Sequence, residues 1–136
     1  NGTPSQMRNC EEGGCHRCAN PQSYPSGEGY DLCICVHAEQ NALLAAARFG
    51  VAIEGCVLYT TLQPCFGCLK EILQANVSEV CYLQQWESRF AEQYAALVER
   101  LGPERFRRVV VADPDAAWAL GRTGEAGERT LGHEFL

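Results

Sequence analysis

The feature that most constrains this chain is a histidine and two cysteines at spacings suited to a single metal ion. His37 opens a run rich in Ala and Leu, and Cys65 follows it by 28 residues, directly after Pro64. Cys68 lies three residues beyond Cys65, so on a helix both sulfurs share one face. An imidazole and two thiolates are ligands that zinc prefers. The pattern therefore predicts a zinc site built from His37, Cys65 and Cys68.

Glu39 is the candidate catalytic residue of this site. Three protein ligands leave the fourth tetrahedral position of zinc open to water, which distinguishes a catalytic site from a closed structural one. Glu39 lies two residues after His37, too close to be a second ligand of the same kind, and its side chain is long enough to reach a water on the metal. A carboxylate placed there can take a proton from the water and pass it on.

Each part of this pattern has a simpler explanation when taken alone. Cys65 and Cys68 have the spacing of a redox dithiol, a cysteine that opens a helix is often inert, and a histidine before an apolar helix often serves as a cap. The combination favours a catalytic metal, because Glu39 and the proline before the first cysteine are also in place. The hypothesis fails if the two sulfurs are joined to each other or if another side chain fills the fourth position.

Length and charge limit the architecture and the partners. With 136 residues, 46% of them hydrophobic, the chain has apolar material for one core, so residues 1–136 are interpreted as a single domain. The formal net charge of -6 disfavours nucleic acid as a partner, because nucleic-acid binders need a basic surface. No apolar run reaches the roughly 18 residues of a membrane span, so no membrane association is expected. Nine cysteines without a recognisable secretory signal favour metal ligation and a reducing, cytoplasmic location.

Periodicity predicts alternating helices and strands after a loop-rich start at residues 1–31. The expected elements are helices at 37–49 and 65–75, an amphipathic helical pattern at 86–101, strands at 55–62, 77–83 and 106–112, and a tail at 113–136. This order is typical of an α/β layer with right-handed crossovers between parallel strands. In such a layer, the helix N-termini that carry His37 and Cys65 lie beside each other.

The residues around the metal pattern resemble the cytidine deaminase superfamily and, within it, the deoxycytidylate (dCMP) deaminases. Zinc deaminases carry H-x-E and P-C-x-x-C motifs. The resemblance covers about residues 1–83 of the sequence. The segments that carry it are Asn-Gly-Thr-Pro at 1–4, the Cys-rich stretch at 10–18, Ser-Gly-Glu-Gly at 26–29, residues 32–44 around His37-Ala38-Glu39, Leu-Tyr-Thr-Thr at 58–61, and Pro-Cys-Phe-Gly-Cys at 64–68.

This resemblance implies a cytidine-deaminase-like three-layer α/β/α fold with a mixed sheet, here lacking the family's usual N-terminal helix and two strands. Truncation, a rearranged fold, or completion by another segment or subunit would each account for that difference. It implies hydrolysis of dCMP to dUMP and ammonia, in which zinc-bound hydroxide attacks C4 and Glu39 shuttles protons. The Asn of the Asn-Gly-Thr-Pro loop contacts the nucleotide sugar in such enzymes, so Asn1 is the candidate substrate-binding residue. A homo-oligomer and a deoxynucleoside triphosphate effector are further implications.

A second group of metal-binding side chains precedes His37. Its candidate ligands are Cys10, Cys15, His16, Cys18, Cys33 and Cys35, of which four would suffice for a structural zinc. Such a site would stiffen a segment without a core of its own, although spare buried thiols are an equally good interpretation. Cys56 and Cys81 lie in expected strands and are interpreted as small core residues.

Two other functions share these features. A deaminase acting on cytosine or adenine in single-stranded DNA or in tRNA carries the same metal motif, although the acidic net charge weighs against it. A non-catalytic, zinc-stabilised scaffold would keep the ligands without turnover. The choice among dCMP, CMP, a nucleoside and a polynucleotide base stays open from the sequence.

Overall fold

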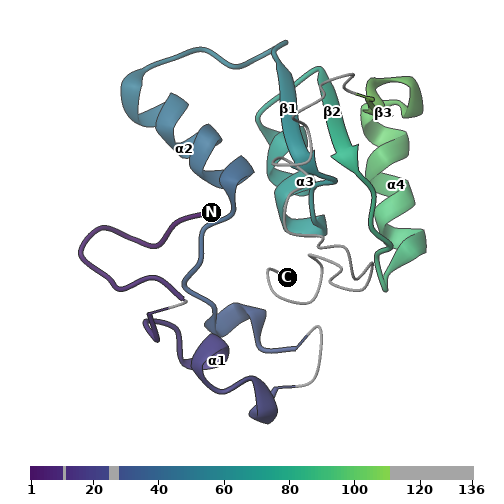
Figure 1. The fold of residues 1–136 in the computed structure, drawn as a ribbon. Coiled ribbons are helices and arrows are strands. Elements are labelled where there is room, and N and C mark those ends of the chain that lie inside the picture. Colours follow the sequence, from purple (N-terminus) through teal and green to yellow (C-terminus); the bar gives the residue numbers. More distant parts are fainter. Residues whose placement is uncertain (11, 25–27, 111–136) are drawn as a thin grey trace.

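Three parallel strands form the central sheet in the computed structural model of the chain, which describes residues 1–10, 12–24 and 28–110. In spatial order the strands are β1 (Val57–Leu62), β2 (Glu79–Gln84) and β3 (Phe106–Arg108). The register places Leu58 opposite Val80, and Val80 opposite Phe106. Helices α3 (Phe66–Gln74) and α4 (Ala91–Leu101) connect successive strands, so each connection joins two parallel neighbours (Figure 1).

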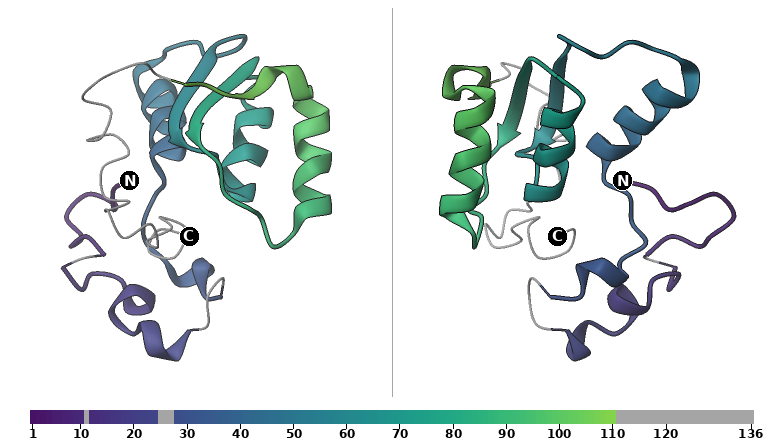
Figure 2. Two further views of the ribbon diagram at one scale, coloured as in Figure 1. Left: turned by 45° about the vertical axis from the view of Figure 1, so that its right-hand side comes forward. Right: turned by 180° about the vertical axis from the view of Figure 1, so that it is seen from behind.

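The hydrophobic core lies between the sheet and these two helices (Figure 2). Alternate residues of a strand point to the same face, and Val80 and Tyr82 of β2 both belong to the core. Leu69 and Ile72 of α3 are three residues apart, so they share one helix face, and both are fully buried. The remaining members are Cys68, Val77, Tyr94, Leu101 and Phe106. The core therefore fixes α3, whose first turn carries one of the expected metal ligands.

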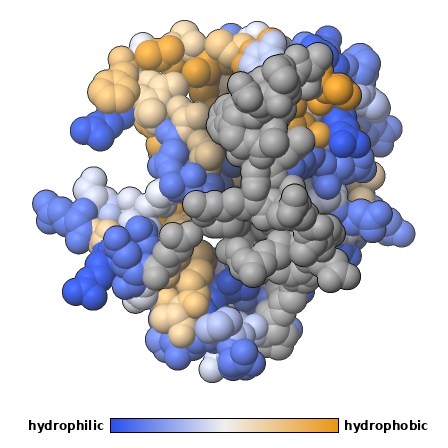
Figure 3. Space-filling view, viewed as in Figure 1, coloured by the Kyte–Doolittle hydropathy of each residue, from blue (hydrophilic) through white to orange (hydrophobic). Residues whose placement is uncertain are grey.

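Helix α2 (Ala38–Phe49) is attached to this unit much more loosely. It is rich in good helix formers and ends at Gly50, whose left-handed backbone (φ 68°) suits a glycine. It contacts α3 but contains no buried residue. Leu44 is 61% exposed and Phe49 is 74% exposed, and Figure 3 shows apolar surface over this part of the molecule.

In its described residues, the N-terminal segment before His37 forms three short elements: α1 (His16–Ala19), η1 (Pro21–Ser23) and η2 (Tyr30–Leu32). The sequence did not predict these turns. An antiparallel bridge between Gly2 and Val36 ties the first residues to the residue before His37. Short elements without a shared core need other links to hold them.

The α/β class is confirmed, and the helices and strands follow the expected order. The sheet strands in the described part of the chain are all parallel, so the antiparallel members of the expected mixed sheet are not found there. The helical pattern from residue 86 was wrong at its start: α4 begins at Ala91, while Trp86 packs on the core from outside the helix. Phe90 is exposed at the N-cap.

The two strand cysteines differ from each other. Cys81 is fully buried in β2, which confirms its assignment as a core residue. Cys56 lies one residue before β1 and is exposed, so the same assignment was wrong for it. The expected tail at 113–136 lies outside the described residues. Within the described part of the chain, every helix is too short or too polar to cross a membrane.

Tyr94 provides a test of how the core supports the segment before Cys65. Its hydroxyl donates a 2.6 Å hydrogen bond to the carbonyl oxygen of Pro64 in a buried setting. Tyr94→Phe leaves that carbonyl without this donor, so we expect the free energy of unfolding to fall by about 1–2 kcal/mol. Tyr59→Phe is the control, because Tyr59 is 71% exposed and its loss is expected within about 0.5 kcal/mol. Denaturant unfolding measures both, and equal losses would contradict the role of this hydrogen bond.

Candidate metal centre

The side chains of His37, Cys65 and Cys68 meet between two helices. The Nδ1 atom of His37 lies 3.4 Å from the Sγ of Cys65 and 3.4 Å from the Sγ of Cys68, and all three donor atoms lie within 4.8 Å of one another. Tetrahedral zinc, with bonds of about 2.1 Å to nitrogen and about 2.3 Å to sulfur, would separate such a pair by about 3.6 Å. Both cysteines are free thiols. The donor set and its spacing therefore fit a zinc ion.

Helix N-termini position all three ligands. His37 is the N-cap of α2 and Cys65 is the N-cap of α3. The backbone N–H of Cys68, in the first turn of α3, donates to the Sγ of Cys65 at 3.5 Å. Exposed N–H groups and the positive end of the helix dipole stabilise negative charge at such positions. The N-terminus of α3 thus favours the thiolate forms that a metal needs.

The electrostatics of the cysteine pair favour a cation. A hydrogen bond from the Cys68 thiol is the largest cause that lowers the pKa of Cys65, to about 4; burial opposes this shift and the His37 ring adds to it. The same contact raises the pKa of Cys68, because its ionisation would place a second negative charge beside Cys65. The hydrogen bond to Cys65 also raises the pKa of His37. A bound cation would relieve the repulsion between two thiolates and let both sulfurs act as ligands.

The Glu39 carboxylate lies against the ligands and is held from the sheet. Its Oε2 is 3.8 Å from the Sγ of Cys68, and its Oε1 accepts a 3.1 Å hydrogen bond from the hydroxyl of Thr60 in β1. The Thr60 hydroxyl is also 3.1 Å from the carbonyl oxygen of Leu62. A single hydroxyl proton serves these two acceptors in turn. The sheet therefore holds the Glu39 carboxylate beside the sulfur of Cys68, and its role in proton transfer stays a prediction.

Gln40 connects the two helices that carry the ligands. Its Oε1 accepts a hydrogen bond from the backbone N–H of His37 at 3.0 Å, and its Nε2 donates to Oε1 of Glu71 in α3 at 3.0 Å. Because α2 buries no residue, these polar contacts fix its start relative to α3. Sequence reasoning missed Thr60, Gln40 and Glu71. Only Gln40 had a signal, since it stands at the third position after the N-cap, where a side chain can return to the cap.

The segment before Cys65 is clamped on three sides. The backbone N–H of Gln63 donates to the carbonyl of Gln84 at 2.8 Å, and its carbonyl accepts from the indole N–H of Trp86 at 2.5 Å. Tyr94 holds the next carbonyl, that of Pro64. Tyr94 belongs to the core and Trp86 packs against it, and both also set the path of the chain into Cys65.

Asn1 lies beside the start of α2. Its Oδ1 accepts a 2.9 Å hydrogen bond from the backbone N–H of Ala38, the residue after His37. The Gly2–Val36 bridge holds the same loop from the other side. The structure thus brings Asn1 next to the metal ligands, while its contact with a nucleotide sugar stays a prediction.

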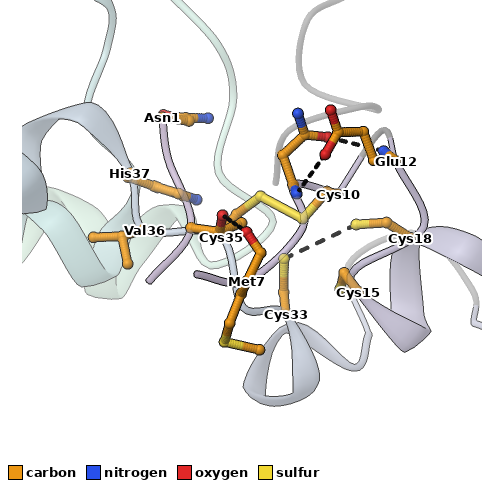
Figure 4. The surroundings of a disulfide bond; sticks show 12 residues. Asn1, Met7, Cys10, Glu12, Cys15, Cys18, Cys33, Cys35, Val36 and His37 are labelled. Carbon is orange, nitrogen blue, oxygen red and sulfur yellow. Dashed lines mark hydrogen bonds between the residues drawn. A yellow bond between two sulfur atoms is a disulfide. The ribbon is translucent and has the colours of Figure 1, made fainter. Parts of the chain in front are cut away.

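The second group of candidate ligands is only partly assembled. The sulfur atoms of Cys10, Cys15, Cys18 and Cys33 lie within 4.8 Å of one another. Cys10 also forms a disulfide bond with Cys35 (Figure 4). The Nδ1 of His16 instead pairs with the hydroxyl of Tyr24 at 3.0 Å, so His16 is not part of this group.

Comparison with known proteins shows what the chain is similar to. Residues 6–84 match the family model of the cytidine and deoxycytidylate deaminase zinc-binding region. Deoxycytidylate deaminase of Schizosaccharomyces pombe is 45% identical over 82 residues, which are 60% of this chain and 24% of that protein. Its counterpart from Saccharomyces cerevisiae is 42% identical over 86 residues, 63% of this chain and 26% of that protein. The chain therefore spans about a quarter of the length of these relatives.

Two further comparisons cover a larger share of the matched protein. ComE operon protein 2 of Bacillus subtilis is 40% identical over 106 residues, 74% of this chain and 56% of that protein. The crystal structure of dCMP deaminase from the cyanophage S-TIM5 in complex with dCMP and dUMP is 32% identical, with a TM-score of 0.46 over 63% of this chain and 67% of that one.

Zinc content tests the assignment of ligands at this site. We expect His37→Ala to lose one zinc ion per chain, because two sulfurs alone bind the ion much more weakly. Glu39→Gln should retain that ion, since its side chain is outside the group of three donors. His16→Ala is the control, because this exposed histidine belongs to neither ligand group. Elemental analysis of the purified proteins gives the counts, and an unchanged zinc content in His37→Ala would refute the assignment.

Proposed function

The chain belongs to the cytidine and deoxycytidylate deaminase zinc-binding family, and we propose on this basis that it deaminates a cytosine nucleotide by hydrolysis, converting dCMP to dUMP with release of ammonia. One observation carries the proposal: the Glu39 carboxylate lies 3.8 Å from the sulfur of Cys68, one of three side chains whose donor atoms fit a zinc ion. The two yeast relatives are deoxycytidylate deaminases, which supports dCMP as the substrate.

Zinc is the cofactor of this family region, and we assign His37, Cys65 and Cys68 as its ligands. A zinc ion bound there supplies Lewis acidity, which makes water a nucleophile near neutral pH. Among the described residues, no fourth His, Cys, Asp or Glu joins these three as a donor. The proposed centre is therefore of the open, catalytic kind.

Glu39 carries the proton transfers in this proposal. Its carboxylate takes a proton from the attacking water, which adds its oxygen to C4 of the cytosine ring. The carboxylic acid then gives that proton to the ring nitrogen N3. A second proton passes from the new C4 hydroxyl through Glu39 to the amino group, the C4–N bond breaks, and ammonia leaves. Thr60 holds one carboxylate oxygen, so the other is directed toward the ligands.

The substrate side of the site is built from the first residues. We assign Asn1 to the nucleotide sugar, because its side chain lies at the start of α2, one residue from His37. The net charge of -6 supports a small nucleotide over a polynucleotide. We further propose a single deaminase domain over residues 1–136, a homo-oligomer, a deoxynucleoside triphosphate effector and a cytoplasmic location. Family resemblance supports the oligomer and the effector, and sedimentation with and without a triphosphate tests both.

A substrate panel tests the reaction. Ammonia release is measured with dCMP, CMP, deoxycytidine and a cytosine-containing oligonucleotide, with zinc content determined on the same sample. We expect dCMP to give the highest kcat/KM, and Glu39→Gln to reduce kcat by at least about 100-fold while zinc is retained. Faster turnover of the oligonucleotide would refute the nucleotide assignment. A fully zinc-loaded chain without turnover of any substrate would instead identify a scaffold.

Thr60→Val tests whether the sheet positions the proton-transfer group. The change removes the hydroxyl that donates to Glu39 at nearly constant volume, so the carboxylate loses its fixed orientation. We expect kcat to fall roughly tenfold with KM and zinc content unchanged, because orientation of the reacting group matters mainly in the transition state. Thr61→Val is the matched control, since Thr61 is the exposed neighbour on the same strand. A kcat equal to that of the control would contradict the positioning role.

A further inference from the structure

We propose that four cysteine sulfurs of the N-terminal segment bind a second, structural zinc ion, and that this ion and the Cys10–Cys35 disulfide exclude each other. The proposal concerns Cys10, Cys15, Cys18 and Cys33 and is independent of the deaminase reaction. It rests on the distances among these sulfurs, on the lack of a core around them, and on the presence of Cys10 in both arrangements.

The sulfur positions suit a tetrahedral ion. The Sγ atoms of Cys18 and Cys33 face each other at 4.0 Å, and all four sulfurs lie within 4.8 Å of one another (Figure 4). A zinc ion with bonds of about 2.3 Å to four sulfurs would space them about 3.8 Å apart. Cys15 and Cys18 have the C-x-x-C spacing of a structural zinc site. Four protein ligands leave no open position for water, so this site would be closed, in contrast to the centre at His37.

The segment that carries these sulfurs has no hydrophobic core. Cys15 is its single buried residue among the described residues before His37. The ligands come from three stretches of chain: Cys10 precedes α1, Cys15 is the N-cap of α1 and Cys18 lies within it, and Cys33 follows η2. One ion on four thiolates would join all three stretches. Segments of this kind gain their folding free energy from metal binding.

Cys10 can take part in either of two arrangements, the four-sulfur group or the disulfide with Cys35. As a thiolate it completes the group of four, and as half of the disulfide with Cys35 it is no longer a thiolate ligand. Disulfide formation transfers two electrons and two protons from the Cys10 and Cys35 thiols to an oxidant such as glutathione disulfide, which leaves as two glutathione thiols. The ion then keeps three sulfurs and is bound more weakly.

The bonding state of Cys10 affects the segment that leads into the His37 site. Cys35 lies two residues before His37, and Val36 between them exchanges two backbone hydrogen bonds with Gly2. Asn1 in turn caps Ala38. Release of Cys35 from the disulfide therefore frees the residue that precedes this bridge, while binding of the second ion anchors Cys33 instead.

Zinc and thiol counts on the purified chain test the proposal. After treatment with a thiol reductant and zinc, followed by removal of free zinc, we expect two zinc ions per chain. After glutathione disulfide, we expect one zinc ion and two fewer free thiols, with Cys10 and Cys35 linked in peptide mass spectrometry. Two retained zinc ions together with that disulfide would overturn the exclusion.

Variants separate the two sites. Cys18→Ser should hold one zinc ion under reducing conditions, whereas Cys35→Ser should hold two before and after glutathione disulfide, because Cys10 has lost its disulfide partner. Cys56→Ser is the matched control: Cys56 is exposed, free, and outside both ligand groups, so its zinc content should equal that of the parent. A second zinc retained in Cys18→Ser would refute the ligand set.

X-ray absorption of the reduced parent protein provides a measurement that no folding defect affects. One site with two sulfurs and one with four gives an average of three sulfurs per zinc, whereas occupation of the His37 site alone gives two. An average of two sulfurs at one zinc per chain would overturn the proposal, and it would leave the proposed deaminase centre intact. Loss of the deaminase activity alone would leave the second site intact.

Discussion

The structure depends on the meeting of one imidazole with two cysteine thiols at the N-termini of α2 and α3. Helix α3 follows β1 directly, so its N-terminus lies at the edge of the sheet where β1 ends, and the start of α2 meets it there through His37. The hydrogen bonds to the carbonyls of Gln63 and Pro64 then place Cys65 at the N-cap of α3. The positive end of the helix dipole at the N-terminus of α3 then stabilises the thiolate charge that metal binding requires.

The two ligand-bearing helices are held in different ways. Helix α3 lies in the core through Leu69 and Ile72. Helix α2 has no fully buried residue: it packs against the core through the partly buried Leu43, and its Gln40 donates a hydrogen bond to α3. A metal ion bound by His37 and the two cysteines would act as a further link between a rigid helix and a loosely attached one. Metal binding and the placement of Glu39 are thereby coupled, because Glu39 lies on the loosely attached helix. The hydrogen bond from Thr60 orients the same carboxylate from the sheet.

Sequence reasoning identified the residues that act through local spacing and missed those that act through tertiary contact. His37, Cys65 and Cys68 could be predicted because helix periodicity and ligand chemistry are both visible in the sequence, and the structure brings their donor atoms together. Thr60 and Glu71 could not, because each gains its role from a partner on another element. Trp86 has the spacing of a helical residue, but it lies between β2 and α4 and donates a hydrogen bond to the carbonyl of Gln63, so the periodicity predicted the wrong element. The assignment of Cys56 to the core was wrong because β1 begins one residue later, at Val57, and composition does not fix where a strand starts.

The number of protein donors explains why one chain would use similar ligands for two purposes. Zinc held by one neutral imidazole and two thiolates carries no net charge, and its open position admits water beside Glu39. Zinc held by four thiolates carries two negative charges and has no open position, so it would neither activate water nor attract an anionic nucleotide. A four-sulfur site can therefore lie within a few residues of the His37 centre without competing for its substrate. The two sites also differ in the reactions open to their cysteines. Cys10 of the four-sulfur site can form a disulfide with Cys35. Cys65 and Cys68 lie in one helical turn, where the backbone N–H of Cys68 donates a hydrogen bond to the sulfur of Cys65.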